Sequence, residues 1–188
     1  MLKAQLQYHI VRLIELVPRE PGTSLPQGAT EVELAAFERT TGMCLPIELI
    51  EWLKICNGPI VGPGGIYGVA PADKFVRIEA HFELYPEWKD RGWFPIAGDG
   101  CGDLYLLDSS SGSEERHPIV FIDQCEMLKP DYLIASDLWH FLYFLLQREL
   151  DYELTKKSHW PFDKARVLEI DPDIEQYAGQ YPIPWETC

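Results

Sequence analysis

The side chains with the most chemical potential in this chain are five histidines, five cysteines and the acidic groups of one glycine-rich turn. The histidines follow no H-E-x-x-H pattern, and the cysteines form neither a C-x-x-C pair nor a zinc-ligand spacing with histidine. We therefore expect no metal site, no cofactor and reduced, mostly structural thiols. The residues concerned are His9, His81, His117, His140, His159, Cys44, Cys56, Cys101, Cys125 and Cys188.

The turn GDGCGD places Asp99 and Asp103 four residues apart, which is compatible in part with a calcium loop. Leu104 occupies the position where an EF-hand requires glycine, and a strand pattern follows instead of a helix. Glycine and aspartate are the residues that tight hairpin turns demand, so we interpret the segment as such a turn. Cys101 is the best-placed nucleophile, but no activating base is visible near it. A hydrolase or small-ligand site that uses this turn and a nearby histidine stays open as an alternative, although we expect no enzyme.

Acidic residues dominate the charge of the chain, with 30 Asp+Glu against 16 Lys+Arg and a formal net charge of −14 over 188 residues. Such a field repels phosphate backbones and anionic lipids, so we expect no binding to nucleic acid or membranes. It attracts basic proteins, although solubility alone would also account for it. Lys3, Arg12 and Glu15 interrupt the apolar start of the chain, and no later apolar run approaches membrane-spanning length. These observations predict a cytoplasmic protein.

The first part of the chain shows helical patterns. Apolar residues recur at helical spacing over 2–17, and a capping box of Thr30 and Glu33 opens a second helix that ends at Gly42. Pro46 suits the first turn of a third helix, which Asn57 and Gly58 end.

The middle of the chain contains strand patterns, namely IYGV at 66–69, WFPIA at 93–97, DLYLLD at 103–108 and PIVFID at 118–123. The last three predict an antiparallel meander, and 73–90 is interpreted as a helix. Ser136 is expected to cap a long helix over 137–153. The remainder, 154–188, is rich in proline and aromatic residues and is predicted to be a wrapped extension.

Five segments carry a family resemblance in their order: ATEVELAAFERTTGMCLPIELIEWLKICNG, GIYGV, FPIAGDGCGDLYLLD, PIVFID and SDLWHFLYFLL. Together they resemble the SUKH superfamily, which includes fungal regulators of cell-wall synthesis and many bacterial proteins. The resemblance implies one α+β domain over 1–188 with a core at about 30–146. N-terminal helices and a long C-terminal helix would flank a mostly antiparallel sheet.

For bacterial members, the resemblance implies a non-enzymatic immunity protein that binds and neutralises a cognate secreted toxin. The acidic charge suits a basic nuclease or deaminase toxin. The alternative function is an intracellular regulatory scaffold related to the control of cell-wall synthesis. Oligomeric state is left open.

The densest acidic stretch, 99–131, is the candidate rim of a partner-binding face, with eight acidic residues against Arg116 and Lys129. A solvated set of turns is the alternative interpretation. Aromatic anchors would supply the desolvated centre of an interface. The residues predicted to bind the partner are Asp99, Asp103, Asp108, Glu114, Glu115 and Trp52.

Overall fold

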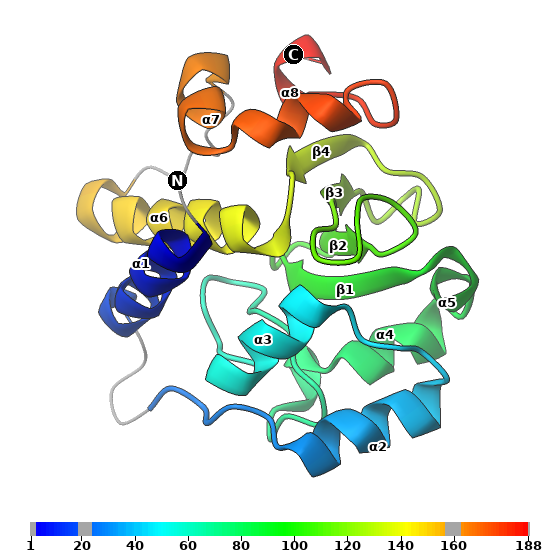
Figure 1. Cartoon of the computed structure of the whole chain (residues 1–188). Helices are drawn as coiled ribbons and strands as arrows, with labels where there is room; N and C mark the ends of the chain where they lie inside the picture. Colours follow the sequence, from blue (N-terminus) through cyan, green and yellow to red (C-terminus); the bar gives the residue numbers. More distant parts are fainter. Residues whose placement is uncertain (1–2, 19–23, 157–162, 188) are drawn as a thin grey trace.

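Four antiparallel strands form a sheet at the centre of the molecule, in the order β1-β2-β3-β4 (Figure 1). The structure is a computed structural model, and it describes residues 3–18, 24–156 and 163–187. Each strand pairs with the next one along the chain, as the expected meander requires. The strands are β1 (Trp93–Gly98), β2 (Leu104–Asp108), β3 (Ile119–Ile122) and β4 (Tyr132–Ala135).

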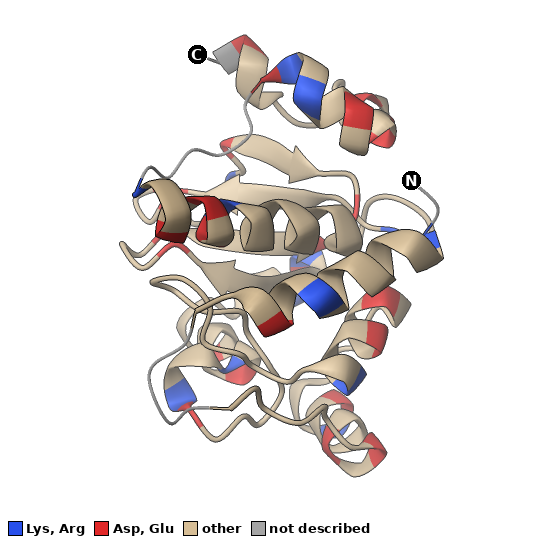
Figure 2. Ribbon diagram, turned by 90° about the vertical axis from the view of Figure 1, so that its left-hand side faces the viewer, with Lys and Arg blue, Asp and Glu red and all other residues tan. Residues whose placement is uncertain are grey.

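Helices surround this sheet, and the expected α+β fold in one compact domain is confirmed. The long helix α6 (Leu138–Thr155) lies across one face of the sheet, and α1 (Lys3–Leu16) packs against it (Figures 1 and 2). Below β1 in Figure 1 lie the helices α2 (Glu31–Thr41), α3 (Ile47–Ile55), α4 (Ile78–Leu84) and α5 (Glu87–Arg91). Above β4 lie α7 (Lys164–Ile170), the 3₁₀ helix η2 (Pro172–Tyr177) and α8 (Pro184–Thr187).

The start of α2 follows the predicted capping box. The hydroxyl oxygen of Thr30 accepts a hydrogen bond from the backbone N–H of Glu33 at 3.2 Å, and the carboxylate of Glu33 accepts one from the backbone N–H of Thr30 at 2.7 Å. Gly42 ends the helix with φ at 75°, a left-handed conformation that costs glycine little. Pro46 precedes the first residue of α3, where a missing N–H does no harm.

Four expectations about local structure are wrong. Residues 66–69 form only isolated bridges, at Ile66 and Gly68, instead of a strand. The expected helix over 73–90 is divided into the 3₁₀ helix η1 (Lys74–Val76), α4 and α5, because the backbone at Arg77 is extended and Pro86 lacks an N–H. Strand β4 was not expected.

The fourth wrong expectation concerns the N-terminal cap of α6. This cap is Asp137, whose carboxylate accepts the N–H of His140 at 2.9 Å, whereas the hydroxyl of Ser136 donates to Asp171.

Both outer edges of the sheet carry hydrogen bonds from irregular segments. Along β1, the N–H of Tyr67 donates to Ile96 at 2.8 Å, and the N–H of Gly98 donates to Gly65 at 3.3 Å. Along β4, the N–H of Leu133 donates to the carbonyl of Pro182 at 2.9 Å. The 181–183 segment of the tail therefore lies against β4.

Candidate protein-binding surface

The acidic residues of the predicted rim lie at two opposite ends of the sheet. Asp99 and Asp103 belong to the turn between β1 and β2, whereas Asp108 ends β2 and leads into the loop that carries Glu114 and Glu115. β2 separates the two groups, and five extended residues span roughly 16 Å. The expected single rim is therefore two separate acidic surfaces, and only the residues within each end lie near one another.

Asp108 was predicted to lie on the rim, but it is an internal residue, because only 3% of it is exposed. Its carboxylate accepts hydrogen bonds from the N–H and the hydroxyl of Ser110 at 2.9 Å and 2.6 Å. It also accepts a short hydrogen bond from the hydroxyl of Tyr181, a residue of the tail. Asp108 thus joins the end of β2 to the extension, and its oxygens face protein groups instead of solvent.

The prediction for Trp52 needs the same correction, because this residue of α3 is completely buried in the core. A side chain in this position cannot anchor a partner without opening the fold. Trp93 and Trp139 are buried too. Exposed aromatic surface must therefore come from other residues.

The turn that contains Asp99 is a hairpin turn between paired strands, as predicted. One oxygen of the Asp99 carboxylate accepts the N–H groups of Cys101 at 2.7 Å and Asp103 at 3.0 Å, which explains why aspartate stands there. Asp103 in turn accepts the N–H of Gln124 at 3.0 Å and joins this turn to the loop after β3. Cys101 is exposed at the tip.

A groove of about 630 Å³ opens beside Asp99, and we call it the α6 groove. Its floor is a row of three aromatic side chains, Tyr105, Phe121 and Tyr132, that lie directly opposite one another on β2, β3 and β4. The ring centroids of Tyr105 and Phe121 are 5.4 Å apart, and Phe121 and Tyr132 stack at 4.9 Å. The remaining lining residues are Val17, Pro18, Gly62, Pro63, Asp99, Arg148, Glu149, Tyr152 and Glu153.

The C-terminal half of α6 forms the charged wall of this groove. Arg148 is 8% exposed, and its guanidinium donates to Glu149 at 2.9 Å and 2.7 Å and to the hydroxyl of Tyr105 at 3.4 Å. Glu153 and Tyr152 lie on the next turn and are exposed. Figure 2 shows acidic residues gathered at this end of α6.

Of the residues that line the α6 groove, the sequence alone pointed only to Asp99. The lining residues come from three strands, α6 and three connecting segments, and in its local sequence each resembles an ordinary core or surface position. The aromatic residues at Tyr105, Phe121 and Tyr132 were visible, but their alignment depends on the register of the sheet, which no local pattern fixes.

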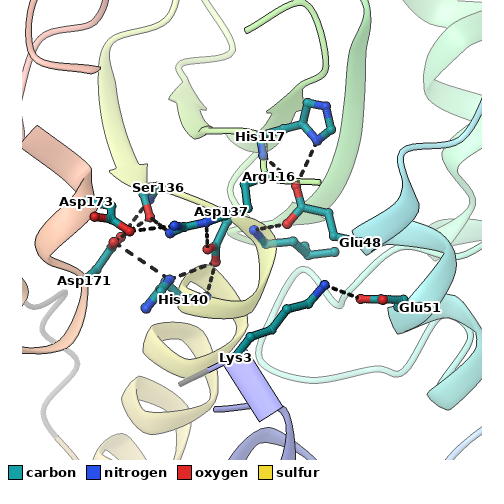
Figure 3. Close-up of polar contacts among 11 residues, drawn as sticks. Lys3, Glu48, Glu51, Arg116, His117, Ser136, Asp137, His140, Asp171 and Asp173 are labelled. Atoms are coloured by element: carbon teal, nitrogen blue, oxygen red, sulfur yellow. Dashed lines mark hydrogen bonds and ion pairs between the residues drawn. The ribbon is translucent and has the colours of Figure 1, made fainter. Parts of the chain in front are cut away.

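A second set of polar side chains is buried between the sheet, α3, α6 and the tail (Figure 3). Glu48 is wholly buried and accepts the N–H of His117 at 2.7 Å and the N–H of Leu138 at 2.9 Å. Burial raises the pKa of Glu48, against the hydrogen bond with His117, which lowers it.

Asp137 and His140 form the other half of this buried set, with the His140 ring Nδ1 2.8 Å from the Asp137 carboxylate and 3.8 Å from Asp171. Burial opposes the charged imidazolium, but the hydrogen bond with Asp137 and the charge of Asp171 outweigh it, so the pKa of His140 is raised. Arg116 joins the set through ion pairs with Asp137 at 2.8 Å and Asp173 at 2.5 Å.

A carboxylate–histidine pair can perform acid–base chemistry when substrate reaches it. Here Asp137 and His140 are only 4% and 7% exposed, and with Arg116 they line a small pocket of about 130 Å³. Asp171 is wholly buried and accepts both the N–H and the hydroxyl of Ser136, at 2.7 Å and 2.5 Å. The arrangement in Figure 3 binds the tail to the start of α6.

Within residues 3–18, 24–156 and 163–187, no group of three or more His, Cys, Asp or Glu side chains could hold a metal ion. Nor does any helix of these ranges have the length and apolar character needed to cross a membrane. In the comparisons, the model of the SMI1 / KNR4 family (SUKH-1) matches residues 28–143. No curated protein matches the chain.

Proposed function

Because the chain belongs to the SMI1 / KNR4 family (SUKH-1), we propose that it is a non-enzymatic, protein-binding domain that neutralises a cognate secreted toxin as an immunity protein. The observation that carries this proposal is the acidic end of the sheet. There Asp99 lines the α6 groove and Asp103 belongs to the same turn, and the groove is apolar on its floor and mostly acidic on its wall. An apolar centre with a charged rim is the composition of a protein-binding surface.

The proposed toxin is basic, for example a nuclease or deaminase domain. A channel that attracts nucleic acid also attracts an acidic protein, because both present negative charge to the same lysine and arginine side chains. Long-range attraction would speed the encounter, and contacts in the groove would slow dissociation. The net charge of −14 supports such steering.

The proposal places the protein in the cytoplasm, where an incoming toxin would meet nucleic acid. It also assigns no reaction to the buried histidines. Asp137 and His140 are paired with each other in a small pocket of about 130 Å³, and the carboxylate of Asp99 next to the exposed Cys101 accepts backbone N–H groups of its own turn.

Affinity capture tests the function directly. The tagged protein is incubated with lysate and culture supernatant of its own organism at low and high salt, and bound proteins are identified by mass spectrometry. The proposal expects one basic partner that is toxic when expressed alone and harmless when co-expressed with this chain. Recovery of several cell-wall synthesis or signalling proteins would favour the regulatory scaffold instead, and a captured partner without toxicity would contradict the immunity role.

Charge variants at the two ends of the sheet show which end binds the partner. Asp103→Asn together with Glu126→Gln removes charge from the groove end of the sheet, whereas Glu114→Gln with Glu115→Gln removes the same charge from the opposite end. We expect the first pair to weaken capture and flatten its salt dependence, with little effect from the second. Equal effects would show that only the total charge of the protein matters.

A further inference from the structure

We propose that the α6 groove binds an arginine side chain on a basic segment of the protein partner. This inference rests on the proposed protein-binding function and adds the place of contact and the chemistry of the occupant. Three features of the groove lead to it: the aromatic floor, the surplus of carboxylates in the wall, and the ion pairs that the chain already forms there.

The floor offers aromatic surface to a planar cation. Phe121 and Tyr132 stack with an interplanar angle of 18° and are partly exposed, and Tyr152 on the wall is 46% exposed. A guanidinium group stacks on such rings and is more weakly hydrated than an ammonium group, so it loses less on entering an apolar groove. The floor therefore favours arginine over lysine.

The wall has more negative than positive groups. The lining residues include three carboxylates, Asp99, Glu149 and Glu153, against the single guanidinium of Arg148. Arg148 donates to the Oε1 atom of Glu149 at 2.9 Å and 2.7 Å, and the carboxylates of Asp99 and Glu153 add negative charge beyond this ion pair. This surplus of negative charge would repel an anionic segment.

The chain itself already places cations against these same groups. Arg148 binds a carboxylate and a phenol hydroxyl at the floor, and the ammonium of Lys156 lies 5.7 Å from the ring centroid of Tyr152 and 3.0 Å from Glu153. The pair of Lys156 and Glu153 is well exposed, and such pairs contribute little stability, so an incoming arginine can displace the lysine.

The size of the groove indicates a segment of chain instead of a free amino acid. Its volume of about 630 Å³ exceeds that of one side chain. Beside the aromatic floor, Val17 and Pro63 supply apolar surface for the residues that flank the arginine.

Nuclear magnetic resonance titration with short peptides tests the inference without knowledge of the partner. The probes are acetyl-Gly-Arg-Leu-Arg-Gly-amide and the same peptide with citrulline or lysine in place of arginine. Citrulline keeps the shape but removes the charge. We expect saturable shifts of the backbone amides of Phe121, Tyr132 and residues 148–153, with the citrulline peptide about tenfold weaker and the lysine peptide several-fold weaker.

Variants on the exposed wall keep the test independent of folding. Tyr152→Ala with Glu153→Gln is expected to weaken the arginine peptide about tenfold. The matched control, Tyr8→Ala with Glu169→Gln, changes the same residue types at exposed positions of α1 and α7 and should leave binding unchanged. Shifts centred elsewhere, equal binding of the citrulline peptide, or an unaffected wall variant would overturn the inference.

The result also separates this inference from the proposed function. Peptide binding in the groove without a toxic partner in the capture experiment would leave the groove chemistry standing and contradict the immunity role. If the wall variant binds a captured toxin as tightly as the unaltered protein does, the immunity function stands, but the α6 groove is not the surface that contacts the toxin.

Discussion

One carboxylate oxygen of Glu48 contacts His117 twice, lying 2.7 Å from its backbone N and 3.0 Å from its ring Nδ1. The other oxygen accepts the N–H of Leu138 at 2.9 Å. A single buried side chain of α3 thus joins the segment that leads into β3 to the first turn of α6. The acidic residue in this position satisfies donors that would otherwise be buried without partners.

Replacing Glu48 with alanine is therefore expected to be strongly destabilising. The change leaves the N–H groups of His117 and Leu138 without their acceptor, and we expect the free energy of unfolding to fall by about 3–5 kcal/mol. Urea denaturation followed by circular dichroism measures it. Glu51→Ala, which removes a half-exposed ion pair with Lys3, is the control and should cost less than about 1 kcal/mol. Similar small losses in both variants would contradict the structural role.

The attachment of the tail depends on Asp171. Asp171→Ala removes the acceptor of both the N–H and the hydroxyl of Ser136, so we expect a loss of about 2–3 kcal/mol. Hydrogen exchange should become faster at the Ser136 amide and in α7, because these contacts join the tail to α6. Asp173→Ala removes a more exposed partner of Arg116 and should have a smaller effect. Unchanged exchange in α7 would show that apolar contacts alone fix the tail.

The largely buried imidazole of His81 predicts acid sensitivity. The ring stacks on Tyr67 at 4.6 Å, and burial lowers the pKa of His81 to about 4. Between pH 4 and the ordinary value of 6.5 the unfolded chain binds a proton that the folded protein excludes. Stability contributed by the neutral ring is therefore present above pH 6.5 and is lost as the pH falls toward 4, by up to about 3 kcal/mol.

Denaturation curves at several pH values check this prediction, with His81→Phe expected to remove most of the slope between pH 6.5 and 4. The raised pKa of His140 acts in another window, because its charged form stabilises the protein below pH 6.5 and this contribution is lost above it. An unchanged slope in His81→Phe below pH 6.5 would show that another group is responsible.

Gly64 permits the close approach of the 62–65 loop to β1. A Cβ atom at Gly64 would lie 2.2 Å from the carbonyl carbon of Gly98, which is backbone and cannot rotate away. Gly64→Ala is expected to lower stability by about 3 kcal/mol and to displace Gly62 and Pro63 from the groove. Gly179→Ala, where no atom lies within 4 Å of the added Cβ, is the control and should change stability by less than about 0.5 kcal/mol. Thermal denaturation distinguishes the two.

Local chemistry explains which parts of the fold were predictable. The capping box of Thr30 and Glu33 and the turn at Asp99 depend on neighbouring residues, so their patterns identified them correctly. The cap of α6 was assigned one residue too early, because Ser136 and Asp137 are both suitable caps and only the distant Asp171 decides between them. Strand β4 is four residues long and is completed by pairing with β3, which its own sequence does not disclose.

The candidate site was less predictable because it depends on long-range placement. Charge along the chain grouped Asp99 with Asp108, but the direction of β2 takes them to opposite ends of the sheet. Burial of Trp52 follows from packing on more than one side, which a helix pattern does not report. The prediction that Asp99, Asp103, Glu114 and Glu115 contact a partner stays a prediction.

The irregular segments along β1 and β4 also determine how the protein behaves toward other copies of itself. An open sheet edge is a template for pairing with another chain, and this sheet is almost entirely apolar. Tyr67 and the carbonyl of Pro182 occupy the two edges instead. A shortened protein that ended at Lys156 would expose β4 and invite edge-to-edge aggregation, so the tail protects solubility as well as contributing to the core.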